Sequence, residues 1–141
     1  MLVRLLYASR ATDPSGTEAI HAILRQSQAH NRQHGITGNL CHSEKIFMQV
    51  LEGGRGAVNA LYARILRDPR HSDAILLHYE EINERRYAGW SMGQANLARV
   101  NPSTLLKFSD VPELNPHAMS GKNSLALMDE LMATASIVGR P

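Results

Sequence analysis

The fold is decided by one stretch of the sequence, KIFMQVL at residues 45–51. In an extended chain alternate side chains point to opposite faces, so Ile46, Met48 and Val50 share one face. The other face carries two more apolar residues and Gln49. Both faces are apolar apart from that amide. The stretch therefore predicts a strand within a sheet that is covered on both sides.

Further stretches on either side also have the pattern of strands. The polar turn Ser43-Glu44 joins Ile36–His42 to Lys45–Glu52, which predicts a hairpin. The remaining strands are predicted at Leu2–Ala8, Ala74–Ile82 and Trp90–Ala95.

Two amphipathic helices are predicted between these strands. The first carries an apolar stripe at helical spacing, formed by Ile20, Ile23, Leu24 and Ser27. Ser15 and Glu18 have the spacing of a capping box at its start, and Gly35 marks its end. The second helix carries the stripe Val58, Leu61, Tyr62 and Ile65. Pro69 marks the end of that second helix.

The remaining C-terminal residues predict a helical cap. A short helix is expected at Ser103–Phe108, and Ser124–Ile137 has a broad apolar face. The order βαββαββ predicts an α+β, ferredoxin-like sandwich, in which an antiparallel sheet carries both helices on one face. The C-terminal helices would cover the other face. Residues 1–95 then form the core, and residues 96–141 form a cap of the same domain.

Composition excludes several classes of protein. The 141 residues suit one domain, and 43% hydrophobic with 20% charged residues is a globular composition. A net charge of +2 is too small to attract nucleic acid by bulk electrostatics. The single cysteine, Cys41, excludes an internal disulfide framework. No membrane span or signal peptide is recognised, so a cytoplasmic protein is expected.

Three polar residues are out of place in a plain core. Asn31 continues the apolar stripe of the first helix, Gln49 interrupts the apolar strand, and Tyr7 shares a strand face with Val3 and Leu5. An unpaired buried polar group costs roughly 1–3 kcal/mol, so each side chain must find a partner. Nearby backbone could satisfy any one of them. Three together favour a site that binds a heterocycle through its carbonyl and ring-nitrogen edges.

Other polar and aromatic residues have a structural and a functional interpretation. Arg64 lies on the flank of the second helix, from which it could reach a phosphate or remain solvated. Trp90 and Met92 are expected on one strand face, either as core residues or beside a ligand. His30 and His34 have i, i+4 spacing but lack the other ligands of a metal site, so no metal is expected.

Five motifs occur in an order that resembles one known family. They are LLYAS at 5–9, Asn31 with GITG at 35–38, FMQVLEG at 47–53, DPRH at 68–71 and WSMG at 90–93. Together they resemble the BLUF family, whose members sense blue light with FAD. The resemblance covers about residues 1–95.

The resemblance implies a flavin between the two helices and assigns roles around it. Ile23 and Ile65 would grip the ring, and Asn31 would bind its polar edge beside Ser27 and His30. The phosphate side would be lined by Arg64, Asp68, Arg70 and His71. Tyr7 would donate an electron and a proton to the excited flavin through Gln49. Trp90 and Met92 would respond to the resulting change in the hydrogen bonds of Gln49.

The same resemblance implies a non-enzymatic sensor. About 45 residues follow the core, fewer than an ordinary catalytic domain needs, so a separate partner protein or a homodimer would carry the signal. FMN or riboflavin could replace FAD. Two alternatives stay open: a small flavin-dependent redox enzyme, and an acylphosphatase-like hydrolase that uses Arg10.

Overall fold

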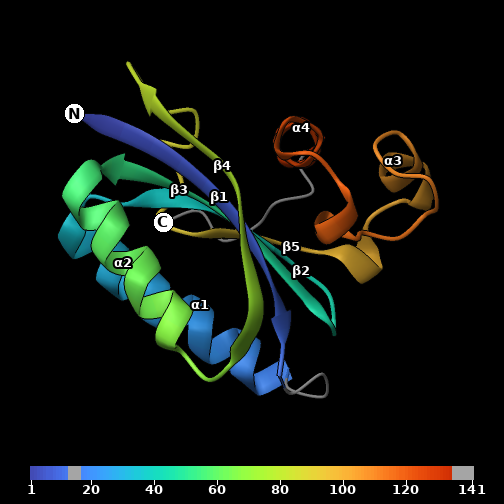
Figure 1. The fold of residues 1–141 in the computed structure, drawn as a ribbon, viewed down its shortest axis with the longest axis horizontal. Coiled ribbons are helices and arrows are strands. Elements are labelled where there is room, and N and C mark those ends of the chain that lie inside the picture. The colour runs from blue at the N-terminus through green and yellow to red at the C-terminus, as the bar shows by residue number, and fades with distance from the viewer. Residues whose placement is uncertain (13–16, 135–141) are drawn as a thin grey trace.

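The strands form one mixed sheet, shown in Figure 1. The computed structural model describes residues 1–12 and 17–134. Five strands line up in the order β4-β1-β3-β2-β5. Their bounds are β1 Leu2–Ala11, β2 Thr37–His42, β3 Ile46–Gly54, β4 His71–Ile82 and β5 Gly93–Asn96. The predicted order of elements and the hairpin of β2 with β3 are confirmed.

The direction of the last strand departs from the prediction. β5 pairs with β2 in parallel, whereas every other pair in the sheet of described residues is antiparallel. β5 is also shorter than predicted, because the chain turns and bends through residues 88–92 before it enters the sheet. The sheet is therefore mixed, and residues 90–92 do not follow strand alternation.

Helices cover both faces of the sheet. On one face lie α1, Thr17–His34, and α2, Arg55–Arg67. Beyond the opposite face lie the C-terminal helices α3, Pro102–Leu106, and α4, Gly121–Ala133 (Figure 1). Two short 3-10 turns, Leu97–Arg99 and Pro116–Ala118, complete the elements. We call the side of the sheet that α1 and α2 cover the helix face, and the side toward α3 and α4 the cap face.

Helix ends follow the sequence where they are described. α1 ends at His34, and Gly35 takes a φ of +67°, the left-handed conformation that glycine adopts easily. The predicted capping box of Ser15 and Glu18 lies outside the residues whose side chains are described. The last turn predicted for the C-terminal helix, up to Ile137, also lies outside them.

Each face has its own hydrophobic core. The helix face buries Val3, Leu5 and Tyr7 of β1 against α1 and α2. The cap face buries Leu6 and Ala8 of β1 against Leu127, Met128 and Leu131 of α4. The predicted two-sided burial of β3 is confirmed, since all of residues 46–53 are buried.

The start of α4 lies directly on strand β4. A Cβ atom added at Gly121 would lie 1.9 Å from the carbonyl oxygen of Leu77. No side chain fits in that gap, so only glycine allows the helix to begin so close to the strand. Within residues 1–12 and 17–134, no helix has both the length and the apolar character to cross a membrane.

Candidate functional site

A pocket of about 490 Å³ opens on the helix face, between the two helices and the first and third strands. Its apolar wall includes Ile23 of α1 and Leu61 and Ile65 of α2. Its polar lining is formed by Tyr7, Gln26, Ser27, His30, Gln49, Arg64, Arg67, Asp68, Arg70 and His71. Every predicted cofactor-binding residue except Asn31 therefore lines one pocket.

Tyr7 and Gln49 form the floor of this pocket. They lie opposite each other in the antiparallel pairing of β1 with β3, which aligns their side chains. The Tyr7 hydroxyl donates a hydrogen bond to Gln49 Oε1 at 2.5 Å. Both residues are buried, and burial raises the pKa of Tyr7 far above its usual value. The phenol therefore stays protonated and remains a donor.

The NH₂ group of Gln49 has a weak partner. Gln49 Nε2 donates to the thioether sulfur of Met92 at 3.3 Å. A thioether is a poor acceptor compared with a carbonyl oxygen. The backbone of Met92 is held separately, because its carbonyl accepts from Gln28 Nε2 at 3.2 Å. Gln49 is thus firmly bound at its oxygen and loosely bound at its nitrogen.

Asn31 is fully buried and is not among the residues that line the pocket. Its Nδ2 donates to the carbonyl oxygen of Ser91 at 2.9 Å. Its Oδ1 has no hydrogen-bond partner among the described residues. The three polar residues singled out from the sequence meet only in part: Tyr7 binds Gln49, while Asn31 and Gln49 hold neighbouring residues of the same segment.

The prediction that Trp90 and Met92 share a strand face was wrong. Met92 belongs to the core of the helix face, whereas Trp90 belongs to the core of the cap face. The reason is that both residues precede β5, in a stretch of turns and bends where side chains do not alternate regularly. Met92 contacts Gln49 through its sulfur.

The rim of the pocket carries basic and imidazole groups. Arg64 is exposed, and its Nη1 donates to Nδ1 of His30 at 3.2 Å. His30 stacks on His34 with ring centres 4.1 Å apart. Burial, with further contributions from His34 and Arg64, lowers the pKa of His30. A neutral His30 that accepts a bond from Arg64 fits these contacts.

The corner after α2 is rigid. Arg70 binds the carboxylate of Asp68 through Nε at 3.0 Å and Nη2 at 2.5 Å. These hydrogen bonds hold the pKa of Asp68 below its usual value. His71 follows, and its Nδ1 lies 2.7 Å from the Ser9 hydroxyl oxygen. The rings of His71 and Tyr7 form a T-shaped pair with their centres 6.3 Å apart. Burial lowers the pKa of His71 as well, so its ring is neutral.

Several residues of the site were not predicted. Leu61 could have been found, since it shares the apolar stripe of Ile65, and Gln26 lies one residue before Ser27. Ser9 is fully buried and orients His71, but a serine at the end of a strand carries no sequence signal of that role.

Comparison with known proteins identifies the family. The sequence matches the family described as "BLUF: Sensors of blue-light using FAD" over residues 2–93. Photoactivated adenylate cyclase subunit beta of Euglena gracilis is 41% identical over 95 residues, which are 67% of this chain and 11% of that protein. The chain thus spans about a tenth of the curated relatives it matches.

Solved structures agree over a larger part of the chain. The BlsA photo-activated state has a TM-score of 0.86 at 26% identity and covers 100% of this chain and 99% of that one. The BlrB dark-state structure, a BLUF protein, has a TM-score of 0.76 at 32% identity, with 95% and 96% covered. Klebsiella pneumoniae BlrP1 with FMN and cyclic diGMP has a TM-score of 0.68 at 31% identity, with 76% and 29% covered. The family match over residues 2–93, together with these structures, shows that the chain belongs to the BLUF family, the sensors of blue light that use FAD.

Proposed function

We propose that blue light is sensed here through the Tyr7–Gln49 pair, with the flavin bound non-covalently in the pocket between α1 and α2. The observation that carries the proposal is the asymmetric bonding of Gln49. Its oxygen accepts a 2.5 Å bond from Tyr7, while its nitrogen has, among the described residues, the sulfur of Met92 as its partner. Such an amide can exchange its partners at little cost when the site changes.

The residues present fit a flavin. The ring system is flat and apolar with a polar edge, and the pocket offers aliphatic walls from Ile23 and Ile65. Asn31 does not line the pocket, but its Oδ1 is buried without a partner among the described residues. An acceptor left unpaired in this way costs free energy unless a ligand donor reaches it. Asn31, with Ser27 and His30, would hold that edge.

The phosphate side is assigned to the basic rim. Arg64 is exposed at the pocket mouth and is bound only to a neutral His30 in the contacts described, so its guanidinium can turn to an anion. Arg70 is already paired with Asp68, so we assign the Asp68–Arg70–His71 corner to shaping the pocket. FAD is the expected flavin, and FMN fits the same ring site.

The chemistry then follows from the groups in contact. Bound flavin supplies the absorption of blue light and a strong oxidant in its excited state. Tyr7 keeps its proton in the dark because burial raises its pKa, and it holds that proton toward Gln49 Oε1. Gln49 carries both a donor and an acceptor, so it can pass the proton or reverse its hydrogen bonds. Met92 is the partner that gives way.

The proposed output is a signal and not a turnover. The polar lining of the pocket consists of amides, a phenol, a hydroxyl, imidazoles and charged groups. The Ser9 hydroxyl lies 2.7 Å from His71 Nδ1, but Ser9 is fully buried and is not among the residues that line the pocket, so it is not placed to attack a substrate. We assign residues 1–95 to flavin binding and 96–141 to a cap that passes the signal to a separate cytoplasmic protein or a second copy of the chain.

Two conservative variants test this mechanism. Tyr7→Phe and Gln49→Leu should each bind flavin but lose the reversible red shift of the flavin spectrum under blue light. Tyr62→Phe is the matched control, because the ring of Tyr62 packs 5.4 Å from that of Tyr7 yet lies outside the Gln49 bond. This control should keep the shift. A normal shift in Tyr7→Phe, or steady turnover of NAD(P)H by the wild type, would contradict the proposal.

A further inference from the structure

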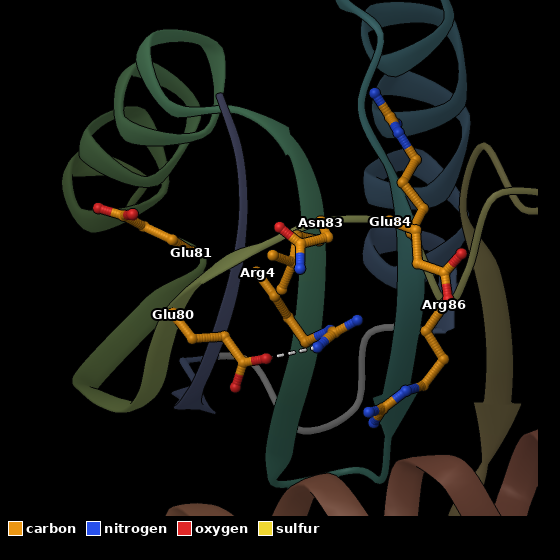
Figure 2. A pocket seen from close by; sticks show the side chains of 8 residues that line it. Arg4, Glu80, Glu81, Asn83, Glu84 and Arg86 are labelled. Atoms are coloured by element: carbon orange, nitrogen blue, oxygen red, sulfur yellow. Dashed lines mark hydrogen bonds and ion pairs between the residues drawn. The ribbon is translucent and has the colours of Figure 1, made fainter.

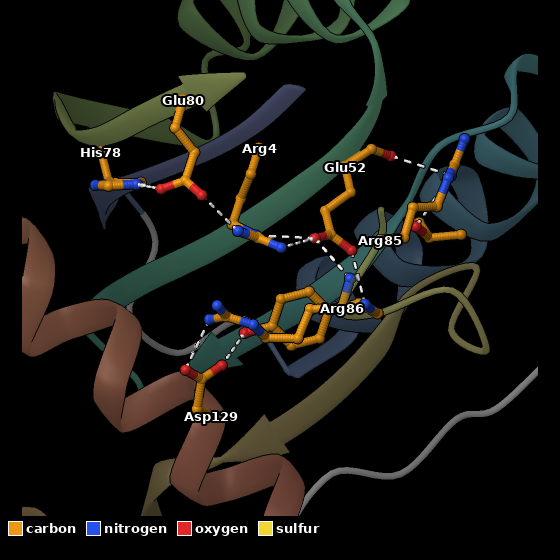
Figure 3. A network of polar contacts seen from close by, with 9 residues as sticks. Arg4, Glu52, His78, Glu80, Arg85, Arg86 and Asp129 are labelled. Carbon is orange, nitrogen blue, oxygen red and sulfur yellow. Dashed lines mark hydrogen bonds and ion pairs between the residues drawn. The ribbon is translucent and has the colours of Figure 1, made fainter. Parts of the chain in front are cut away.

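A row of charged side chains crosses the cap face, beside the apolar core of that face. Glu80, Arg4 and Glu52 lie side by side on β4, β1 and β3 in the register of the sheet. Arg4 donates through Nε to Glu52 at 2.8 Å and through Nη1 to Glu80 at 2.7 Å. Figure 3 shows this row running from His78 and Glu80 through Arg4 to Glu52.

Glu52 is fully buried and holds the loop between β4 and β5. Its carboxylate accepts the backbone N–H of Arg86 at 3.0 Å and that of Tyr87 at 2.7 Å. A buried charge needs several donors, and these two are supplied by the loop. The loop is therefore fixed to β3, three residues from Gln49.

An open hollow borders this network, but its arginines already have partners. Figure 2 shows Arg4 pointing toward Glu80, with Arg86 on the other side. Arg85 donates to the hydroxyl of Thr37 at 3.1 Å. The hollow is thus the solvent edge of the network, and we assign no ligand to it.

The same loop grips helix α4 through one carboxylate. Arg86 Nη1 donates to Asp129 Oδ2 and the Tyr87 hydroxyl donates to Asp129 Oδ1, each at 2.8 Å. Both oxygens of Asp129 are therefore held from adjacent residues of the loop (Figure 3). Two charge-assisted bonds to one carboxylate define its position better than a single ion pair does.

The other end of this segment belongs to the photochemical site. Ser91 accepts from Asn31, and Met92 accepts from Gln28 and Gln49. A turn joins the two ends, because the Trp90 N–H donates to the Tyr87 carbonyl at 3.1 Å. The segment from Arg86 to Met92 thus touches Asp129 at one end and the amide of Gln49 at the other.

We propose that Asp129 is a positioning residue for the photochemical site: through Arg86 and Tyr87 it holds the segment that places Met92 against Gln49. The inference rests on the proposed function and adds a residue of the cap to it. Coupling between two sites is reciprocal. If the bonds of Asp129 to Arg86 and Tyr87 favour the dark arrangement of Met92, these bonds must weaken when Gln49 changes its partner. Light then frees α4 from the loop.

Dark recovery in the full chain with bound flavin tests the proposal. Asp129→Asn keeps the shape of the side chain but removes its charge, so the dark arrangement loses stability. The Asp129 bonds re-form during the return to the dark state, so weakening them should make the red-shifted state return roughly fivefold more slowly. Tyr87→Phe removes one hydroxyl and should slow the return by a smaller factor. Glu130→Gln is the matched control, because its ion pair joins α4 to Lys107 and not to the loop.

The outcomes separate the two proposals. We expect Asp129→Asn and Tyr87→Phe to recover more slowly in the dark, with a red shift of unchanged size. We expect Glu130→Gln to recover at the wild-type rate. Hydrogen exchange of α4 should rise with light in the wild type and be high already in the dark in Asp129→Asn. If Asp129→Asn does not fold, Tyr87→Phe decides alone. Recovery at or above the wild-type rate in both variants, or equal slowing in Glu130→Gln, overturns the role of Asp129 only. A wild type without a red shift overturns both proposals.

Discussion

The two faces of the sheet both bury polar side chains, but they satisfy them differently. On the helix face, Gln49 has a sulfur as its second partner and Asn31 keeps one oxygen unpaired among the described residues. On the cap face, the Glu52 carboxylate receives Arg4 and two backbone N–H groups. The incomplete bonding leaves the first face ready for a ligand and a switch. The complete bonding of Glu52 fixes the row of Glu80, Arg4 and Glu52 on the second face, although Asn39 on that face has no side-chain partner among the described residues.

Removing the cap gives the largest expected effect. A chain ending after Asn101 lacks α4 and exposes the apolar cap face around Leu6, Met48 and Val50. Exposed apolar patches of this kind drive association, so the truncated protein should aggregate or bind hydrophobic dye strongly. Light scattering and dye fluorescence measure this. A soluble truncated monomer with no gain in dye binding would show that the cap face does not depend on α4.

The next largest effect is expected from breaking the ion pairs of the buried row formed by Glu80, Arg4 and Glu52. Glu52→Ala leaves the buried Arg4 without the fully buried one of its two carboxylate partners, which should lower the free energy of unfolding by about 3–5 kcal/mol. Chemical denaturation measures the loss. The double variant Arg4→Met/Glu52→Leu removes both charges together and should recover most of the stability. If Glu52→Ala unfolds like the wild type, the row does not hold the loop.

Two buried asparagines, one on each face, test this difference between the faces. Asn39 of β2 is fully buried, and neither polar atom of its side chain has a partner among the described residues. By strand alternation with Leu40 it faces the cap. Asn31→Leu should weaken flavin binding by about 1–3 kcal/mol, whereas Asn39→Leu should leave flavin binding unchanged and match or raise stability. Flavin titration that finds equal losses would refute the separation of the two faces.

The smallest effect is the response to acid. Burial lowers the pKa of His71 and of His42 below the ordinary value near 6.5. Between the lowered pKa and 6.5 the unfolded chain binds protons that the folded chain does not, so stability is full above 6.5 and falls as the pH drops below it. Thermal melts from pH 7.5 to 5 should show this decline. His42→Gln should flatten it, and an unchanged slope in that variant would rule His42 out as a cause.

Local patterns predicted the elements, while the resemblance to the BLUF family supplied most of the pocket residues. Strand alternation placed Gln49 in the interior and the flank of α2 placed Arg64 at the rim, whereas Ile65 was implied as a pocket residue by the resemblance. Local pattern could not place Trp90 and Met92, since turns break the alternation before β5. It also missed the charged row and its link to the cap, because Arg4 lies 48 residues from Glu52, and Asp129 lies 42 from Tyr87. Arg4 within an apolar run was the visible signal of that row.

Because Gly121 has no side chain, α4 is held against β4 at its first residue, and the rest of the helix can pivot about that point. Backbone contact with Leu77 fixes the helix at its first residue, and the grip on Asp129 acts eight residues later, about 12 Å along the axis. A small loosening at Asp129 would swing the far end of the helix while its start stays seated on β4. The last residue of α4, Ala133, lies about 18 Å from Gly121, so a shift at Asp129 would be about 1.5 times larger there.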